Sequence, residues 1–184
     1  MALNALITRR TIRQYQKDYI IPEAELKAIV DAALLSPTGL DVQDVDLLVI
    51  TNRQKIEEAT KVTLDTIEEE GRIKFMKRIN NFKVQNPITG DAGCLICLLK
   101  NERSTPDHTP VHEGIVEMAL MIASREFGLQ SMVLGCMKHA DRSAIEKVLG
   151  IEPGRLLCGV VIGKPVEKPF FIPKKFKAKA TYLK

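Results

Sequence analysis

Tryptophan is absent from this chain of 184 residues, and aromatic side chains make up only 5% of it. Long apolar runs are missing too, since none approaches the roughly 18 residues that a membrane-spanning helix requires. The sequence has no internal repeat, no low-complexity tract and no Gly/Ser-rich linker. With 45% hydrophobic and 27% charged residues, the composition argues against a disordered chain, a collagen and a coiled coil. We expect a globular protein that is not embedded in a membrane.

Cysteine is scarce as well, and its four positions all lie in apolar surroundings: Cys94, Cys97, Cys136 and Cys158. We expect reduced thiols in the core of a cytoplasmic protein, not a disulfide framework. Cys94 and Cys97 have the spacing of a redox pair, but they lie inside an apolar run typical of a strand. A spacing of three residues in a strand directs the two side chains to opposite faces, which favours core packing.

Charge is distributed unevenly along the chain, whose net charge is +4. Residues 164–184 carry seven lysines and one glutamate, so the rest of the chain is slightly negative. This basic C-terminal extension has three interpretations: a solvated terminus, a clamp for a phosphate, or an arm that binds nucleic acid. The acidic body, the few aromatic residues and the lack of a helix-turn-helix pattern argue against a nucleic-acid partner.

The length corresponds to one domain, which we assign to residues 1–184, with 164–184 as its basic extension. The hydrophobic patterns predict helices at residues 2–8, 22–36, 53–70, 111–127 and 142–149. They predict strands at residues 45–51, 94–99, 132–136 and 156–162. Residues 72–92 have a polar pattern typical of a mobile segment. Helices and strands are mixed without strict alternation, which favours an α+β fold.

Local signals predict where several of these helices begin and end. Asn52 and Asp141 can cap the helices that follow them, since their side chains accept backbone N–H groups. Gly71 and Gly150 are predicted to end those two helices, and Pro37 to end the helix before it.

Three arginines, Arg9, Arg10 and Arg13, fall within five residues, and Thr11 adds a hydroxyl donor. The guanidinium fork matches phosphate oxygens, although a basic group after a helix is also typical of a solvated surface or a partner of the helix dipole. His108 and His112 have the spacing of a metal pair on a helix. Pro110 lies between them and no matching Cys/His cluster exists, so we favour loop and helix-cap roles.

The order of segments is more specific than any one of them. Arg-Arg-Thr-Ile-Arg follows the first helix, and Ser-Pro-Thr-Gly-Leu-Asp-Val-Gln follows the second. Phe-Gly-Leu-Gln-Ser, Leu-Gly and Leu-Gly-Ile-Glu-Pro-Gly come later, before the strand that ends Val-Ile-Gly-Lys-Pro. This ordered set resembles the nitroreductase family of FMN-dependent oxidoreductases over nearly the whole chain, most weakly at residues 60–92.

The resemblance implies an α+β sandwich with a mixed or antiparallel sheet flanked by helices, in an intertwined homodimer with FMN at the subunit interface. It also implies a ping-pong reaction in which NADH or NADPH reduces FMN and a small electron-poor acceptor, such as a nitroaromatic or a quinone, takes the electrons. No side-chain acid or base is demanded, so no catalytic residue is assigned. The alternative is a flavin-binding or flavin-sensing protein with little reductase turnover.

The resemblance further implies which residues hold the cofactor. Near the N-terminus, the residues matched to the FMN phosphate, ribityl chain and ring edge are Arg9, Arg10, Thr11 and Arg13, with Arg13 beside flavin N1 and O2. The loop matched to a flavin contact from the partner subunit contains Pro37, Thr38, Gly39, Asp41 and Gln43. Backbone groups near flavin N5 are matched to Leu134 and Gly135. The lysines that could close on the phosphate are Lys174, Lys175 and Lys177.

Several positions depart from the family pattern. The usual Asn is Asp41, and the Pro-Trp after the Gln is Asp44-Val45. Further departures are Ala92-Gly93 for Ala-Pro, His112 for Asp, and Met118-Ala119 for Gln-Asn. These departures bear on the acceptor and the nicotinamide donor more than on FMN binding. Residues 60–92 are expected to shape access to the flavin.

Overall fold

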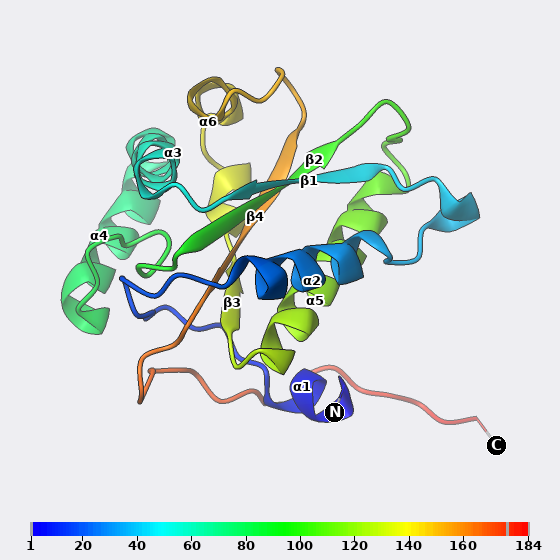
Figure 1. Ribbon diagram of the computed structural model, residues 1–184, viewed down its shortest axis with the longest axis horizontal. Helices are drawn as coiled ribbons and strands as arrows, with labels where there is room; N and C mark the ends of the chain where they lie inside the picture. Colours follow the sequence, from blue (N-terminus) through cyan, green and yellow to red (C-terminus); the bar gives the residue numbers. More distant parts are fainter. Residues whose placement is uncertain (1, 176, 184) are drawn as a thin grey trace.

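A computed structural model describes residues 2–175 and 177–183 (Figure 1). Its helices are α1 (Ala2–Thr8), α2 (Glu23–Leu34), α3 (Arg53–Thr66), α4 (Glu69–Phe82), α5 (Thr109–Glu126) and α6 (Arg142–Leu149). Its strands are β1 (Val45–Ile50), β2 (Cys94–Lys100), β3 (Gln130–Val133) and β4 (Leu156–Gly163). Two short 3₁₀ turns, η1 (Gly39–Asp41) and η2 (Gly135–Lys138), complete the order. The predicted α+β class is confirmed.

The four strands form one antiparallel sheet in the order β1-β2-β4-β3. Strand β2 lies inside the sheet, where Cys97 pairs with Leu48 on one side and Gly159 on the other. A strand covered on both faces reads as a continuous apolar run, as β2 does. The sheet order brings the short edge strand β3 and the turn η2 next to β4.

Helices cover both faces of this sheet (Figure 1). Helices α2 and α5 pack on one face, where their apolar side chains join Cys94, Ile96 and Leu98 of β2. Helices α3 and α6 pack on the other, with Leu95 and Cys97. The alternation along β2 therefore places the two cysteines in different halves of the core, and the prediction that they are packing residues is confirmed. Burial raises the pKa of both thiols to about 12.

The predicted helix at residues 53–70 begins where expected, and the Asn52 side chain caps it by accepting a hydrogen bond from the Lys55 N–H, but its predicted end at Gly71 was wrong. Helix α3 ends at Thr66, Ile67 is extended and nearly buried, and α4 begins at Glu69. The acidic run 68–70, interpreted as the end of one helix, supplies the first turn of the next, where negative charge opposes the helix dipole. Gly71 lies inside α4. The predicted mobile segment 72–92 was therefore also wrong over its first half, which is helical to Phe82.

The predicted strand at residues 132–136 also needs correction. Strand β3 begins at Gln130 and ends at Val133, and the chain then turns through η2. The Leu134 N–H donates to Gly159 O at 2.7 Å, which holds this turn against β4. The cap at Asp141 and the stop at Gly150 were correct, and Gly150 is left-handed there, with φ of 69°.

Within the described residues, no helix combines the length and the apolar character needed to cross a bilayer.

Candidate functional site

The basic segment after α1 is anchored by its apolar residues. Ile12 and Tyr15 are buried in the core, and the Tyr15 hydroxyl donates to Ile12 O at 3.0 Å. Thr11 and Arg13, which flank Ile12, stay half-buried at the surface. The segment therefore presents Thr11 and Arg13 from a rigid base, as a binding site for a phosphate or a ring edge requires.

Arg9 and Arg10 lie at the end of α1. Arg10 donates to Ile7 O, in the last turn of the helix, and to Arg9 O just after it, both at 2.7 Å. Arg9 contacts the Met121 sulfur of α5 at 3.9 Å. Both side chains are half-buried. Their assignment to the FMN phosphate stays a prediction. For Arg10 it requires that the guanidinium bind the phosphate while it also donates to the carbonyl groups at the end of α1.

The structure adds Arg78 of α4, which the sequence analysis missed because it assigned no helix there. Its guanidinium lies 4.1 Å from the centre of the Phe75 ring and donates to Pro87 O at 3.3 Å. Burial, and next the nearby charge of Arg13, lower the pKa of Arg78 to about 10. Neither arginine is in an ion pair with a described carboxylate. Two cations near each other without acidic partners favour an anionic or electron-rich ligand.

The backbone of Arg13 is held close to the turn that precedes β2. A Cβ built on Gly90, whose φ is 65°, would lie 2.4 Å from Arg13 O. The Tyr15 N–H donates to Gly90 O at 2.9 Å, and the Gln14 side chain donates to Phe82 O at 2.8 Å. Residues 13–15, the end of α4 and the turn around Gly90 therefore form one packed unit.

Leu134 and Gly135 lie where β3 passes into η2. Leu134 is buried, whereas Gly135 is exposed and a Cβ built on it would meet nothing within 4 Å. The nearby Cys136 is close enough to Arg78 for the guanidinium to lower its thiol pKa, although burial has the larger effect and raises that pKa to about 11. Arg78 is thus near Arg13 on one side and near Cys136, which follows the open backbone of Gly135, on the other. This donor set and open backbone fit the ring of a flavin.

The loop that carries Pro37, Thr38, Gly39 and Gln43 connects α2 to β1 (Figure 1). It is held near the start of α5, where the Gly39 N–H donates to His112 Nε2 at 3.0 Å. Arg9 contacts α5 at Met121, about 13 Å further along the helix axis. One chain therefore does not bring the loop and the arginine segment together.

His112 is buried, and its Nδ1 lies 2.8 Å from Asp44 Oδ1. The Thr109 hydroxyl donates to the other oxygen of Asp44. Burial alone would raise the pKa of Asp44, but the hydrogen bonds from Thr109 and His112 outweigh it, so the pKa is lowered. Of the two histidines, His108 is exposed and occupies the expected N-cap position of α5, although its side chain makes no capping hydrogen bond. His112 has a different role, since it joins α5 to the loop and to Asp44, the residue before β1.

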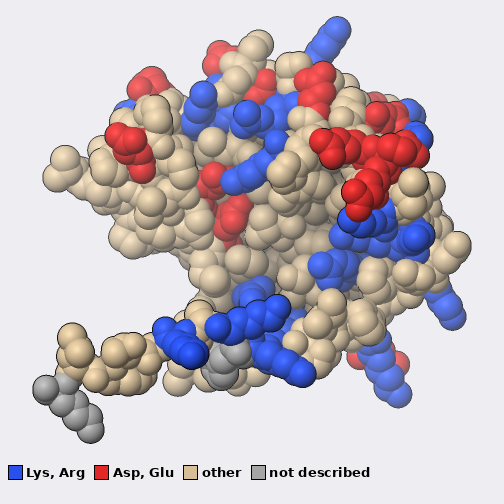
Figure 2. All heavy atoms as spheres, turned by 180° about the vertical axis from the view of Figure 1, so that it is seen from behind, with Lys and Arg blue, Asp and Glu red and all other residues tan. Residues whose placement is uncertain are grey.

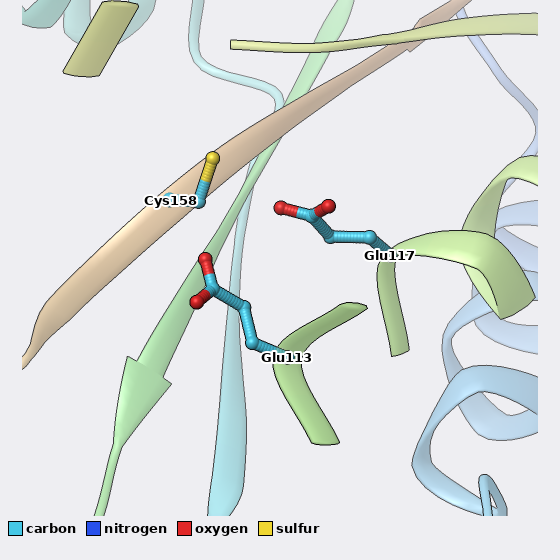
Figure 3. Close-up of side chains that lie close together, drawn as sticks. All are labelled: Glu113, Glu117 and Cys158. Carbon is cyan, nitrogen blue, oxygen red and sulfur yellow. The ribbon is translucent and has the colours of Figure 1, made fainter. Parts of the chain in front are cut away.

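A second polar group lies under η2. Glu113 and Glu117, one turn apart on α5, direct their carboxylates toward Cys158 of β4 (Figure 3). Their ligand atoms and the Cys158 sulfur all lie within 4.8 Å of one another. Burial, and next the charge of Glu117, raise the pKa of the Cys158 thiol, so it is a poor nucleophile. The Lys138 ammonium lies 2.8 Å from Glu113 Oε1. This ion pair ties η2 to α5 and supports the backbone at Gly135.

The C-terminal segment leaves β4 and runs beside the arginine segment. The Gln16 N–H donates to Lys164 O, the Phe170 N–H donates to Gln14 Oε1, and the Phe170 ring lies 5.8 Å from that of Phe82. Lys174 and Lys175 follow as exposed residues. Figure 2 shows basic side chains gathered along this part of the surface, below a hollow. The path starts beside the arginine segment, but whether these lysines meet a phosphate stays a prediction.

Comparisons with known proteins identify the family. The sequence profile described as the Nitroreductase family matches residues 6–164. A protein of Methanothermobacter thermautotrophicus, assigned the name NADH dehydrogenase/NAD(P)H nitroreductase, is 38% identical over 169 residues, which are 91% of this chain and 78% of the relative.

Solved structures show the same fold. A nitroreductase with bound FMN from Desulfitobacterium hafniense superposes with a TM-score of 0.80 at 20% identity, and 98% of each chain is covered. A nitroreductase with bound FMN from Bacteroides fragilis superposes with a TM-score of 0.78 at 17% identity, covering 99% of this chain and 97% of the other.

Proposed function

The chain belongs to the nitroreductase family, and from that premise we propose that it is an FMN-dependent oxidoreductase. It passes electrons from NADH or NADPH to small electron-poor acceptors, such as nitroaromatics or quinones. The nicotinamide donor and the acceptor occupy the same site one after the other. The observation that carries this proposal is that Arg78 lies near both Arg13 and Cys136, the residue next to the open backbone of Gly135, while neither arginine has a carboxylate partner among the described residues. When bound, FMN supplies the redox chemistry.

The residues of this chain bind and orient the cofactor. Arg13 and Arg78 would lie at the electron-rich edge of the ring, where positive charge stabilises the negative charge that reduction creates. Backbone groups of Leu134 and Gly135 would face the central part of the ring. The phosphate would be held by residues of both termini: Arg9, Arg10, Thr11, Lys174 and Lys175. No side chain is required to transfer a proton.

The site is completed by a second copy of the chain, in an intertwined homodimer with FMN at the interface. The loop with Pro37, Thr38, Gly39 and Gln43 is too far along α5 to reach the arginines of its own chain. Large apolar side chains are exposed on elements that pack on α5 and on α5 itself: Leu3, Leu6, Ile7, Leu34, Leu35, Val111 and Met118. A second copy would cover such a surface. In this proposal residues 1–184 form one FMN-binding unit, and 164–184 form its extension.

The cytoplasm is the compartment that fits this chemistry best, since all four cysteines are free thiols. The alternative function, a flavin-binding protein with little turnover, uses the same cofactor site and differs only in the electron transfer. It rests on departures from the family pattern such as Asp41 and Met118. The experiment below separates the two.

The visible spectrum of the purified protein, recorded after addition of FMN and desalting, tests the proposal. We expect a retained yellow band that is lost when Arg9 and Arg13 are both replaced by Ala. Stopped-flow mixing with NADH or NADPH should then bleach the bound flavin, and an acceptor such as a quinone should restore the colour. Failure to retain FMN would refute the site. Retention without bleaching by either nicotinamide would favour the flavin-binding alternative.

A further inference from the structure

The loop at residues 38–43 is held in an unusual backbone conformation. Leu40, Asp41 and Gln43 have φ values of 54°, 55° and 46°, in the left-handed region that residues with a Cβ seldom adopt. Leu40 is completely exposed, so burial of its side chain does not stabilise this shape. Strained backbone of this kind persists only where the surroundings determine it, and it is concentrated at ligand-binding segments.

Polar contacts from other elements hold the two ends of the loop. At its far end, Asn101 and Arg103 donate to Gln43 O at 3.1 Å and 3.0 Å. At its near end, the Gly39 N–H donates to His112 Nε2 at 3.0 Å. Asn101 and Arg103 are partly exposed, whereas His112 is only 5% exposed. His112 is therefore the buried anchor of the near end.

Only one form of the His112 ring satisfies both of its contacts. The Gly39 N–H can only donate, so Nε2 must carry no proton. Nδ1 must then carry the proton and donate to Asp44, whose carboxylate is 1% exposed and accepts from Thr109 as well. Asp44 thereby sets the tautomer of the ring, as a carboxylate does for a histidine that must present a lone pair.

We infer that His112, oriented by Asp44, is a positioning residue that holds residues 38–43 in their binding shape and releases them when its ring takes a second proton. The inference rests on the proposed function, in which this loop contacts the flavin of the partner subunit.

The release follows from the groups that face the ring. The charged or titratable groups shown in contact with it are Asp44 and His108, whose ring stacks on it with centres 6.2 Å apart. A proton on Nε2 would set two donors against each other at Gly39, while the ion pair with Asp44 would become stronger. The doubly protonated ring therefore stays with Asp44, and the loop loses its near anchor.

The test compares the full-length wild type with H112Q. The Gln amide offers one donor and one acceptor and does not titrate between pH 8 and pH 5.5. FMN affinity is measured by quenching of flavin fluorescence at both pH values. The FMN phosphate also takes up a proton near pH 6, which affects both proteins alike. The measured quantity is therefore the dissociation constant of the wild type divided by that of H112Q at the same pH. We expect similar affinities at pH 8 and an affinity about fivefold or more in favour of H112Q at pH 5.5.

A ratio that stays within twofold between the two pH values overturns the inference. The matched control is H139Q, which removes an exposed histidine and should follow the wild type at both pH values.

A second readout does not need FMN. Because the chain contains no tryptophan, L40W places a single fluorescent reporter at the exposed tip of the loop. The fluorescence anisotropy of this tryptophan should fall when the pH is lowered from 8 to 5.5. The double variant L40W/H112Q should not show this fall. If the anisotropy of L40W is the same at pH 8 and pH 5.5, the inference is overturned, even if H112Q does not fold. If the wild type binds no FMN at pH 8, the proposed function fails, and the L40W measurement still decides the role of His112.

Discussion

Arg78 of α4 lies close enough to Arg13 for the two positive charges to repel each other, and burial together with this repulsion lowers the pKa of Arg78 to about 10. The two residues come from segments far apart in the sequence, and neither has a carboxylate partner among the described residues. A protein gains nothing in stability from such a pair. Such a concentration of positive charge favours an anionic or electron-rich ligand.

R78M should therefore weaken FMN binding about tenfold, or ~1.4 kcal/mol, while R78K should retain most of the affinity. Fluorescence titration with FMN measures both. R72M is the matched control, because Arg72 lies on the same helix but is exposed and paired with Glu69 at 2.6 Å. Equal losses in R78M and R72M would show that the helix as a whole, and not the charge at Arg78, supports binding.

The contact between Gly90 and the backbone of Arg13 allows a steric test. A Cβ at Gly90 would lie 2.4 Å from Arg13 O, so G90A must displace residues 13–15. We expect a loss of more than about 2 kcal/mol in unfolding free energy and, in parallel, weaker FMN binding. G150A is the control, since Gly150 has a similar φ of 69° with open space around it. Urea denaturation should show a cost of about 1 kcal/mol there, without a change in FMN affinity.

The buried carboxylate of Asp44 should make stability depend on pH at the acidic end. Its pKa is lower in the folded protein than its ordinary value of 3.8, so the folded state prefers the ionised form. This stabilisation is complete well above pH 3.8 and is lost as the pH falls through the lower folded value. D44N should therefore cost about 1–3 kcal/mol at pH 7, and the difference from wild type should shrink near pH 3.

Urea denaturation at the two pH values measures this difference. The matched control is D31N, whose carboxylate is exposed in a surface ion pair with Lys27 and should change stability by less than about 0.5 kcal/mol. A D44N cost that is the same at both pH values would show that packing, and not charge, explains the role of Asp44.

The four thiols should differ in reactivity in the native protein. Burial raises the pKa of Cys94 and Cys97 to about 12, that of Cys136 to about 11, and that of Cys158 further still. Only Cys136 is partly exposed. Iodoacetamide at pH 8, followed by mass spectrometry, should label Cys136 first and leave the other three until the protein is unfolded. Labelling of Cys94 or Cys97 at the rate of Cys136 would contradict their place in the core.

Features that depend on neighbouring residues could be predicted from the sequence. Asp141 and Gly150 bound a helix because a cap and a left-handed stop are local signals. The apolar run of β2 identified a strand buried on both faces, and the spacing of Cys94 and Cys97 followed from it. The acidic residues 68–70 misled the same reasoning, because they suit the start of a helix better than its end, and only the packing of Ile67 shows where the chain bends.

Features that depend on distant residues could not be predicted. Asp44 and His112 are 68 positions apart, and each reads alone as a departure from the family pattern. Their hydrogen bond joins the two positions in the fold. Arg78 was missed for a related reason: without a helix at residues 69–82, no pattern directs its side chain toward Arg13. The resemblance to the family predicted which segments form the site and their order along the chain. Which distant residues lie next to each segment could be found only from the structure.

The last part of the site to test is the C-terminal segment, which passes the arginine segment at Gln14 and then carries Lys174 and Lys175. If these lysines hold the phosphate, K174A/K175A should weaken FMN binding about tenfold and leave riboflavin binding within twofold, because riboflavin has the same ring without the phosphate. The matched control is K168A/K179A, which removes the same charge from the same segment. Similar losses in both double variants, or an equal loss for riboflavin, would mean that the segment contributes only general positive charge or supports the fold.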